Sequence, residues 1–252
     1  MAFHIKKIMA IMIGLSFSAT SFAAEDLVKI TKDKDYNLDA DLSYLLNTTQ
    51  SSGTASDTKQ SFAGSIDYKR MFGSWGGEFK ASAVNSSDNN SNGTDIEQYL
   101  AFGKMTHSEG SYYEFGKLQW EKDLSSAFDY QTSLTAGLGK ELYRDDVQFL
   151  TGEIGAGVRY DVERAPPQNT STEAIGTVAA HYERQLLPTT RFTQDIGFDY
   201  GSSSNTIRSH SAVSVMMTDK LSGQVSFDYK KINSDEGNSR TTLTAVGLKY
   251  SY

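Results

Sequence analysis

Histidine is the side chain in this sequence best suited to acid–base or metal chemistry near neutral pH. The four histidines are His4, His107, His181 and His210. No HExxH pair, GxSxG elbow or phosphate-binding loop accompanies them. A phospholipase working at a lipid-facing wall needs a Ser and a His close together on that wall, for example two residues apart on one strand. Glu183 and Ala212 stand two residues after His181 and His210. The sequence therefore predicts no catalytic residues and no enzyme activity.

A hydrolase built on a barrel scaffold, a lipase or a protease acting at the outer rim, is the alternative function. Its nearest candidate pair is His210 with Asp199. The histidines fall on different expected strands without clustered ligands, and the chain has no Cys, so we expect no metal site. The glycines around Leu138 and Ala156 precede no helix, which argues against a dinucleotide loop. We expect no cofactor.

The charge balance excludes a further class of partner. The chain has 252 residues, with 24 Lys and Arg against 31 Asp and Glu, which gives a net charge of -7. Its one basic cluster lies at the extreme N-terminus, so we expect no nucleic-acid partner. Tyr and Phe are abundant beside 21 Gly and only 3 Pro, a composition typical of β-rich proteins.

The N-terminus has the organisation of a secretory signal peptide. Lys6 and Lys7 precede the apolar stretch IMAIMIGLSF, and small residues follow as far as Ala23. The apolar stretch is too short for a spanning helix, which needs about 20 residues. We therefore expect export, cleavage of residues 1–23, and a charged periplasmic lead over residues 24–35.

Residues 36–252 alternate apolar and polar side chains with the period of β-strands. In the first stretch, YNLDADLSYLLNT, Leu38, Ala40 and Leu42 share one face, while Asp39 and Asp41 share the other. Twelve such stretches are expected, at about residues 36–48, 60–72, 74–84, 96–105, 112–120, 131–143, 147–162, 174–185, 191–200, 207–217, 222–232 and 241–252.

Long and short connections alternate along this array. The long ones are rich in Ser, Asn, Asp and Gly, and are expected at residues 50–58, 85–95, 121–130, 163–172, 201–206 and 233–240. This alternation is typical of an all-β, up-and-down antiparallel transmembrane β-barrel of about 12 strands, with tight turns on one side and longer loops on the other. An even strand count returns the chain to its starting side, so both termini are expected in the periplasm.

Aromatic and basic residues near the strand ends favour a lipid-facing wall over a soluble barrel. Two aromatic girdles are expected, one of Tyr36, Phe72, Trp75, Phe192, Tyr250 and Tyr252, and one of Tyr44, Trp120, Tyr160, Tyr200 and Tyr229. Four basic side chains are expected to reach lipid headgroups at the tight-turn side: Arg70, Lys104, Lys140 and Arg184. Within residues 112–120, Tyr113 and Phe115 fall on one face while Leu118 and Trp120 fall on the other, which predicts a bulge near Gly116.

Three segments carry a resemblance to a known family. LTAGLGKEL (134–142), EIGAGVRYD (153–161) and the closing strand TTLTAVGLKYSY (241–252) resemble the YdiY family of salt-induced outer-membrane proteins, which has no established activity. The resemblance implies the outer membrane of a Gram-negative bacterium and contact with its lipid. The strand ending at Tyr252 is similar to the C-terminal signal that barrel-insertion machinery recognises. The oligomeric state is left open.

The polar face of the array is expected to line a lumen. The candidates for lining it are Glu153, Arg159, Asp161, His181, Asp195, Asp199, Arg208 and His210. Antiparallel register is expected to set Asp199 opposite Arg208 and His181 beside Asp195. The whole expected inward set holds nine acids against five bases. We therefore expect a narrow passive pore for ions or small solutes with a weak cation preference, or else a purely structural barrel.

Overall fold

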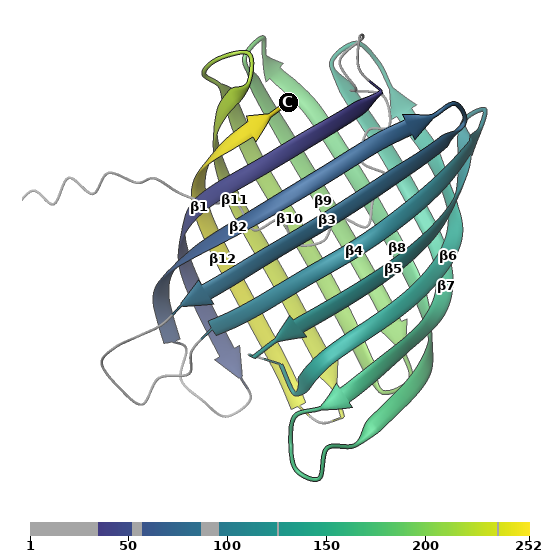
Figure 1. The fold of residues 1–252 in the computed structure, drawn as a ribbon, viewed down its shortest axis with the longest axis vertical. Helices are drawn as coiled ribbons and strands as arrows, with labels where there is room; N and C mark the ends of the chain where they lie inside the picture. Colours follow the sequence, from purple (N-terminus) through teal and green to yellow (C-terminus); the bar gives the residue numbers. More distant parts are fainter. Residues whose placement is uncertain (1–34, 52–56, 87–95, 125, 236) are drawn as a thin grey trace, which may run out of the picture.

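The computed structural model describes residues 35–51, 57–86, 96–124, 126–235 and 237–252. The expected signal peptide and all but the last residue of the expected lead lie outside these ranges. The described residues form one closed β-barrel with strongly tilted strands (Figure 1). In this part of the chain no helix is both long and apolar enough to cross a membrane.

Twelve antiparallel strands make up the barrel, as the alternation predicts. They are β1 (Tyr36–Ser51), β2 (Asp57–Phe72), β3 (Trp75–Ser86), β4 (Ile96–Glu109), β5 (Tyr112–Asp123), β6 (Phe128–Arg144), β7 (Gln148–Glu163), β8 (Thr170–Leu187), β9 (Thr190–Gly201), β10 (Ser204–Met216), β11 (Leu221–Ser234) and β12 (Gly237–Ser251). Each strand pairs with its neighbours in sequence, and β1 pairs with β12 to close the ring. The up-and-down transmembrane topology is confirmed.

One end of the barrel carries the tight turns. Gly73 and Gly110 each begin a two-residue turn, with φ of 66°, in the left-handed region that side chains rarely enter. β1 begins and β12 ends at this same end, where the C-terminus lies in Figure 1. At the opposite end, all six connections are shorter than the sequence predicts. The difference is clearest where only residues 202–203 separate β9 from β10 and 235–236 separate β11 from β12. Strand pairing continues through the polar residues that suggested longer loops.

The turn between β6 and β7 depends on one carboxylate. Asp145 accepts hydrogen bonds from the backbone N–H groups of Val147 and Gln148 at 2.9 and 2.8 Å. The hydroxyl of Tyr143 donates to it at 2.8 Å and the side-chain amide of Gln148 at 3.0 Å. These donors, the Val147 N–H foremost, hold the pKa of Asp145 well below its usual range.

We expect strong acid to loosen this turn. The folded pKa of Asp145 lies below the unfolded value of about 3.9, so the carboxylate stabilises the turn fully above that value and loses its effect as the pH falls through the folded pKa. Asp145→Asn should lower the hydrogen-exchange protection of the Val147 and Gln148 amides at neutral pH. The gap between variant and wild type should close as the pH falls below about 3.9. A gap of constant size across the whole range would count against the carboxylate's role.

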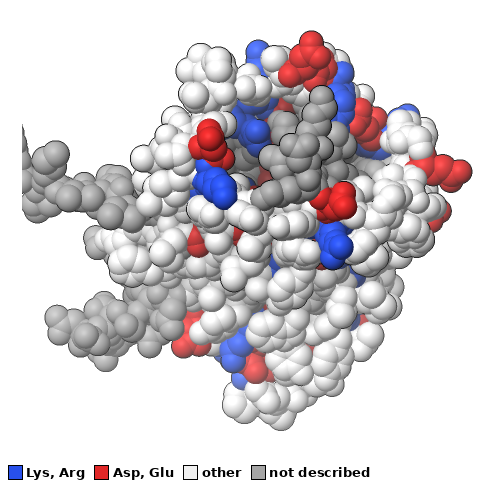
Figure 2. All heavy atoms as spheres, turned by 45° about the horizontal axis from the view of Figure 1, so that its top comes forward, with Lys and Arg blue, Asp and Glu red and all other residues white. Residues whose placement is uncertain are grey.

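The two faces of the wall differ in chemistry as expected for a membrane barrel. Large apolar side chains project outward, and Leu42, Phe62 and Ile154 are 68%, 68% and 65% exposed. Most buried side chains are polar or charged and point inward. Figure 2 shows charged side chains around the mouth at the upper end and at the lower edge, with a largely uncharged wall between them.

The expected bulge at Gly116 is wrong. β5 alternates without interruption, with Tyr113, Phe115 and Lys117 buried inside and their neighbours exposed outside. Its register with β4 and β6 is continuous. The register shifts lie elsewhere, between β6 and β7 at 128/130 and 141/143, and between β8 and β9 at 185/187. The side chains of Tyr113 and Phe115 therefore point into the lumen.

Candidate functional site

The barrel interior is crowded with charge. Among the residues that the structure describes, ten carboxylate side chains and five Lys or Arg side chains are buried. The carboxylates are Asp39, Asp67, Asp123, Glu153, Asp161, Glu173, Glu183, Asp195, Asp199 and Asp228, and the bases are Lys80, Lys104, Lys117, Arg159 and Arg208. The interior therefore carries a formal acid excess, close to the one expected from the inward set in the sequence.

Ion pairs cross the lumen from one wall to the other. Arg208 on β10 contacts Glu121 on β5 at 3.0 Å, and Lys230 on β11 contacts both Glu121 and Asp123 on β5, the latter at 3.0 Å. β5 and β11 stand six places apart in the ring of twelve strands, which is diametrically opposite. We call Glu121, Asp123, Arg208 and Lys230 the transluminal bridge. Arg208 is also held on its own wall by Asp199, at 2.6 Å.

A small cavity lies beside this bridge. A cavity of about 20 Å³ is lined by Gln119, Glu121, Arg159, Asp199 and Arg208 among others. A cavity needs roughly 10–15 Å³ to hold one water molecule. This cavity therefore has room for about one water molecule.

A second set of contacts fills the lumen nearer the tight turns. Lys104 on β4 contacts Glu153 on β7 at 2.5 Å, and the hydroxyl of Tyr113 donates to the same carboxylate at 2.7 Å. Lys104 also lies 5.0 Å from the ring centre of Phe115. The expectation that Lys104 reaches lipid headgroups is wrong, because its even position in β4 points inward and its side chain is only 4% exposed.

Glycines on β6 and β7 make room for the two aromatic rings of β5. A Cβ atom at Gly139 would overlap the ring of Tyr113, and one at Gly155 would press against Phe115. The rings thus cover a stretch of inner wall that has no side chains of its own. This packing explains why Tyr113 and Phe115 face the lumen although most other aromatics near strand ends face outward.

A third cluster lies toward the loop end. Arg159 contacts Glu173 and Asp161, the latter at 3.1 Å, and it also reaches Ser204 on β10. Glu173 accepts hydrogen bonds from the Ser202 hydroxyl at 2.9 Å and the Ser203 N–H at 2.8 Å. This network ties β7 and β8 to the β9–β10 connection.

Two histidine–aspartate pairs form one row along the inner wall. His181 Nδ1 lies 2.6 Å from Asp195, and His210 Nδ1 lies 2.6 Å from Asp228. His181, Asp195, His210 and Asp228 are successive cross-strand partners from β8 to β11. Both histidines are thus placed in the lumen and not on the lipid-facing wall.

All eight residues expected to line the lumen are buried, on strands β7 to β10. The expected pairing of His181 with Asp195 is present. The expected register of Asp199 with Arg208 is wrong by two residues, since Asp199 faces Thr206 and Arg208 faces Gly197. The connection is centred one residue earlier than the Ser-rich sequence suggested, and the long Arg208 side chain still reaches Asp199 diagonally.

Sequence reasoning missed half of the transluminal bridge. The sequence predicts a strand over residues 112–120, which places Glu121 and Asp123 in the connection that follows. The polar residues Lys117, Gln119, Glu121 and Asp123 in fact continue one alternating face to the end of β5. That continued alternation was the signal that could have found them.

Comparison with known proteins gives the chain a family. The family described as "Protein of unknown function, DUF481" matches residues 40–252. The chain belongs to the DUF481 family. The resemblance to YdiY proteins is consistent with this membership. No curated protein matches the DUF481 chain described here.

The DUF481 barrel is similar to solved outer-membrane barrels. An outer membrane channel from Pseudomonas putida F1 aligns with a TM-score of 0.52 at 10% identity, over 86% of this chain and 96% of that one. The NanC porin aligns with a TM-score of 0.50 at 8% identity, over 82% of this chain and 99% of the porin. The translocator domain of the autotransporter NalP from Neisseria meningitidis gives 0.48 at 12% identity, over 88% and 90%. At such low identity the first two similarities show the fold alone, which is that of a membrane barrel.

Proposed function

We propose that this DUF481 protein is a narrow pore for small cations in the outer membrane, and that the transluminal bridge holds it shut or nearly shut in the conformation described. The bridge is the observation that carries the proposal. Its contacts join the walls through ion pairs, which can be exchanged for water and mobile ions. A pore closed in this way can open without unpacking an apolar plug.

The acid excess of the lumen supports a preference for cations. Ten buried carboxylates against five buried bases attract mobile cations wherever water enters. Screening limits this attraction to about 8 Å at physiological salt, so the preference should be weak. Asp195 and Asp199 lie four residues apart on the inner face of β9, and both contribute to the negative potential of the lumen.

Ion selectivity tests the proposal. In planar bilayers with a KCl gradient, we expect a reversal potential of the sign that marks cation preference. Asp195→Asn with Asp199→Asn should move that potential toward zero, because two lumen charges are lost. Glu114→Gln with Asp219→Asn removes two acids that are exposed outside the lumen and should leave it unchanged. Clear anion selectivity of the wild type would overturn the electrostatic argument.

A structural barrel without transport is the second candidate, and the ion pairs that join opposite walls across the lumen favour it. Absence of conductance both in the wild type and in variants that lack the bridge would support it over the pore. We also propose that the protein is not an enzyme. His181 and His210 face carboxylates inside the lumen, so neither presents an imidazole to lipid, and refolded protein should be inactive in lipase and protease assays.

The membrane topology belongs to the same proposal. We infer that the end with the tight turns and both barrel termini faces the periplasm, and that β12, ending beside Tyr252, is the strand recognised by the insertion machinery. The similarity to outer-membrane barrels supports the location. Export by a signal peptide, a Gram-negative source and expression induced by salt are further parts of the proposal that rest on the sequence.

A further inference from the structure

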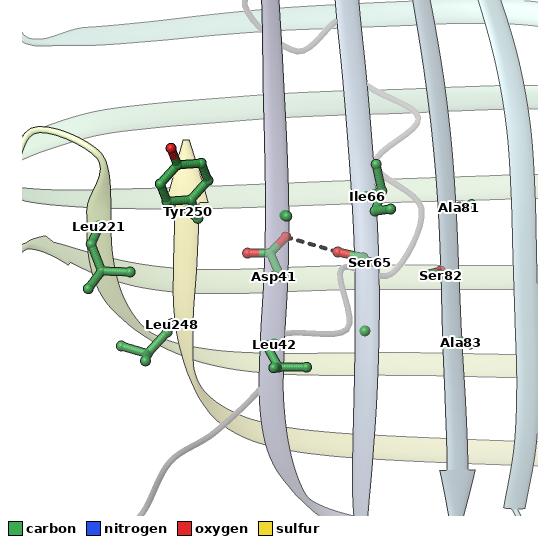
Figure 3. Close-up of a pocket in the computed structure, with 12 residues that line it drawn as sticks. Asp41, Leu42, Ser65, Ile66, Ala81, Ser82, Ala83, Leu221, Leu248 and Tyr250 are labelled. Carbon is green, nitrogen blue, oxygen red and sulfur yellow. Dashed lines mark hydrogen bonds between the residues drawn. The ribbon is translucent and has the colours of Figure 1, made fainter. Parts of the chain in front are cut away.

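The outer wall has a shallow apolar hollow across five strands. It lies over β11, β12, β1, β2 and β3, spans the seam where the barrel closes, and has a volume of about 590 Å³ (Figure 3). Its lining residues include Ala40, Leu42, Gly64, Leu248 and Tyr250. These residues occupy the outward positions of their strands, so the hollow faces lipid and not the lumen.

Two cross-strand rows shape the hollow. One row runs Leu221, Tyr250, Ala40, Ile66 and Ala81, and the other runs Leu248, Leu42, Gly64 and Ala83. Side chains of one carbon or none form its floor. Larger side chains stand up around this floor, with Leu42 68% and Ile66 52% exposed. The lipid-facing surface is therefore recessed where neighbouring parts of the wall carry Leu, Ile or Val.

The dimensions of the hollow fit a single hydrocarbon chain. From β11 to β3 there are four strand spacings of about 4.8 Å, which is roughly 19 Å. Because the strands are tilted, this direction runs obliquely and has a component along the membrane normal. One leaflet of a bilayer has a hydrocarbon depth of about 15 Å, half of the whole core. An acyl chain anchored at one membrane surface could thus follow the hollow over most of its length.

Two cations flank the tight-turn end of the hollow. Lys220 comes directly before Leu221 in the sequence, and Leu221 is one of the lining residues. The Nζ of Lys220 lies 4.2 Å from the ring centre of Tyr252. Arg70 is exposed on the outward face of β2, with its guanidinium 4.9 Å from the ring centre of Phe72. The rings of Tyr36 and Tyr252 are 6.4 Å apart between these cations. Aromatic rings with adjacent cations are typical of the depth at which headgroups lie.

We propose that the hollow is a binding site for one phospholipid of the leaflet at the tight-turn end. An acyl chain lies in the hollow over Ala40 and Gly64, and the phosphate lies against Lys220 and Arg70. The apolar lining and the basic rim match the two ends of such a molecule. The site would also cover the β1–β12 seam, where the first and last strands of the barrel pair.

Native mass spectrometry of the folded full-length chain tests this site. The protein is exchanged into mild detergent with phosphatidylglycerol, and the bound fraction is measured. Ala40→Leu with Gly64→Leu fills the floor of the hollow and displaces part of the acyl chain from it. The affinity should fall about tenfold, which corresponds to the loss of about two buried methylene groups of the lipid. Lys220→Gln and Arg70→Gln should each lower it roughly fivefold. Ala174→Leu, on the exposed outer face of β8, is the control and should bind like the wild type.

The filled variant should still fold, because the nearest atom to a Cβ at Gly64 is the Asp41 carbonyl oxygen at 3.9 Å. Heat-modifiable migration on gels checks this, and Ala81→Leu alone provides a second, milder filling. Equal phospholipid binding by the filled variants and by Ala174→Leu would overturn the proposal. So would a dimer that the filling variants abolish, or selective binding of lipopolysaccharide in place of phospholipid.

Discussion

Removing the carboxylates of the transluminal bridge should raise the conductance of this DUF481 barrel several-fold. Every contact of the bridge between opposite walls runs through Glu121 or Asp123 on β5. Glu121→Gln with Asp123→Asn keeps the side-chain shapes and removes both charges. Arg208 keeps its ion pair with Asp199 on the same wall, and its ion pair with the Glu121 carboxylate across the lumen is lost. Water and ions should then enter the space that the ion pairs occupy.

Single-channel recording in planar bilayers measures this effect. The control is Glu114→Gln with Glu141→Gln, which removes two negative charges from exposed or half-exposed positions away from the bridge. Conductance of the control should equal that of the wild type. Equal conductance of the bridge variant and the control would show that the bridge does not limit permeation.

The second large effect concerns the stability of the Lys104–Glu153 pair. Both side chains are 4% exposed, so removing one partner leaves a buried charge without its counterion. Lys104→Met should lower the free energy of unfolding by about 3–5 kcal/mol. Lys104→Met with Glu153→Gln removes both charges and leaves an amide that can accept the Tyr113 hydroxyl bond, so most of the loss should be recovered.

Equilibrium unfolding by urea in detergent micelles gives these free energies. The pair Arg144 and Glu141 is the control, since its side chains are 34% and 37% exposed and such pairs contribute about 0–1 kcal/mol. A double variant as unstable as Lys104→Met alone would mean that the buried pair is not what the single substitution disrupts.

The strands of this barrel were accessible from the sequence because each property that defines them is local. Alternation along the chain marks a strand, and Gly73 and Gly110 mark tight turns whatever the rest of the molecule does. The pairing of His181 with Asp195 is predictable because the short turn between β8 and β9 fixes the register of these two strands. The register of Asp199 failed by two residues because a polar Ser-rich segment can be either loop or strand end.

The site depends on features that no single strand contains. Tyr113 and Phe115 look lipid-facing in sequence, yet they cover the inner wall at Gly139 and Gly155. Glu121 and Lys230 are 109 residues apart and belong to strands that do not pair. Their contact depends on the cross-section of the closed ring, which alternation and pairwise register do not determine.

A double-mutant cycle between Glu121 and Lys230 tests the central claim most directly. The unfolding free energies of the wild type, Glu121→Gln, Lys230→Met and the double variant are compared in the same micelles. If the two side chains meet across the lumen, we expect a coupling energy within about 0.5–3 kcal/mol, the range for residues in contact. Additivity within about 0.3–0.5 kcal/mol, as for groups more than roughly 7–10 Å apart, would place them on separated walls and contradict a lumen closed by this bridge.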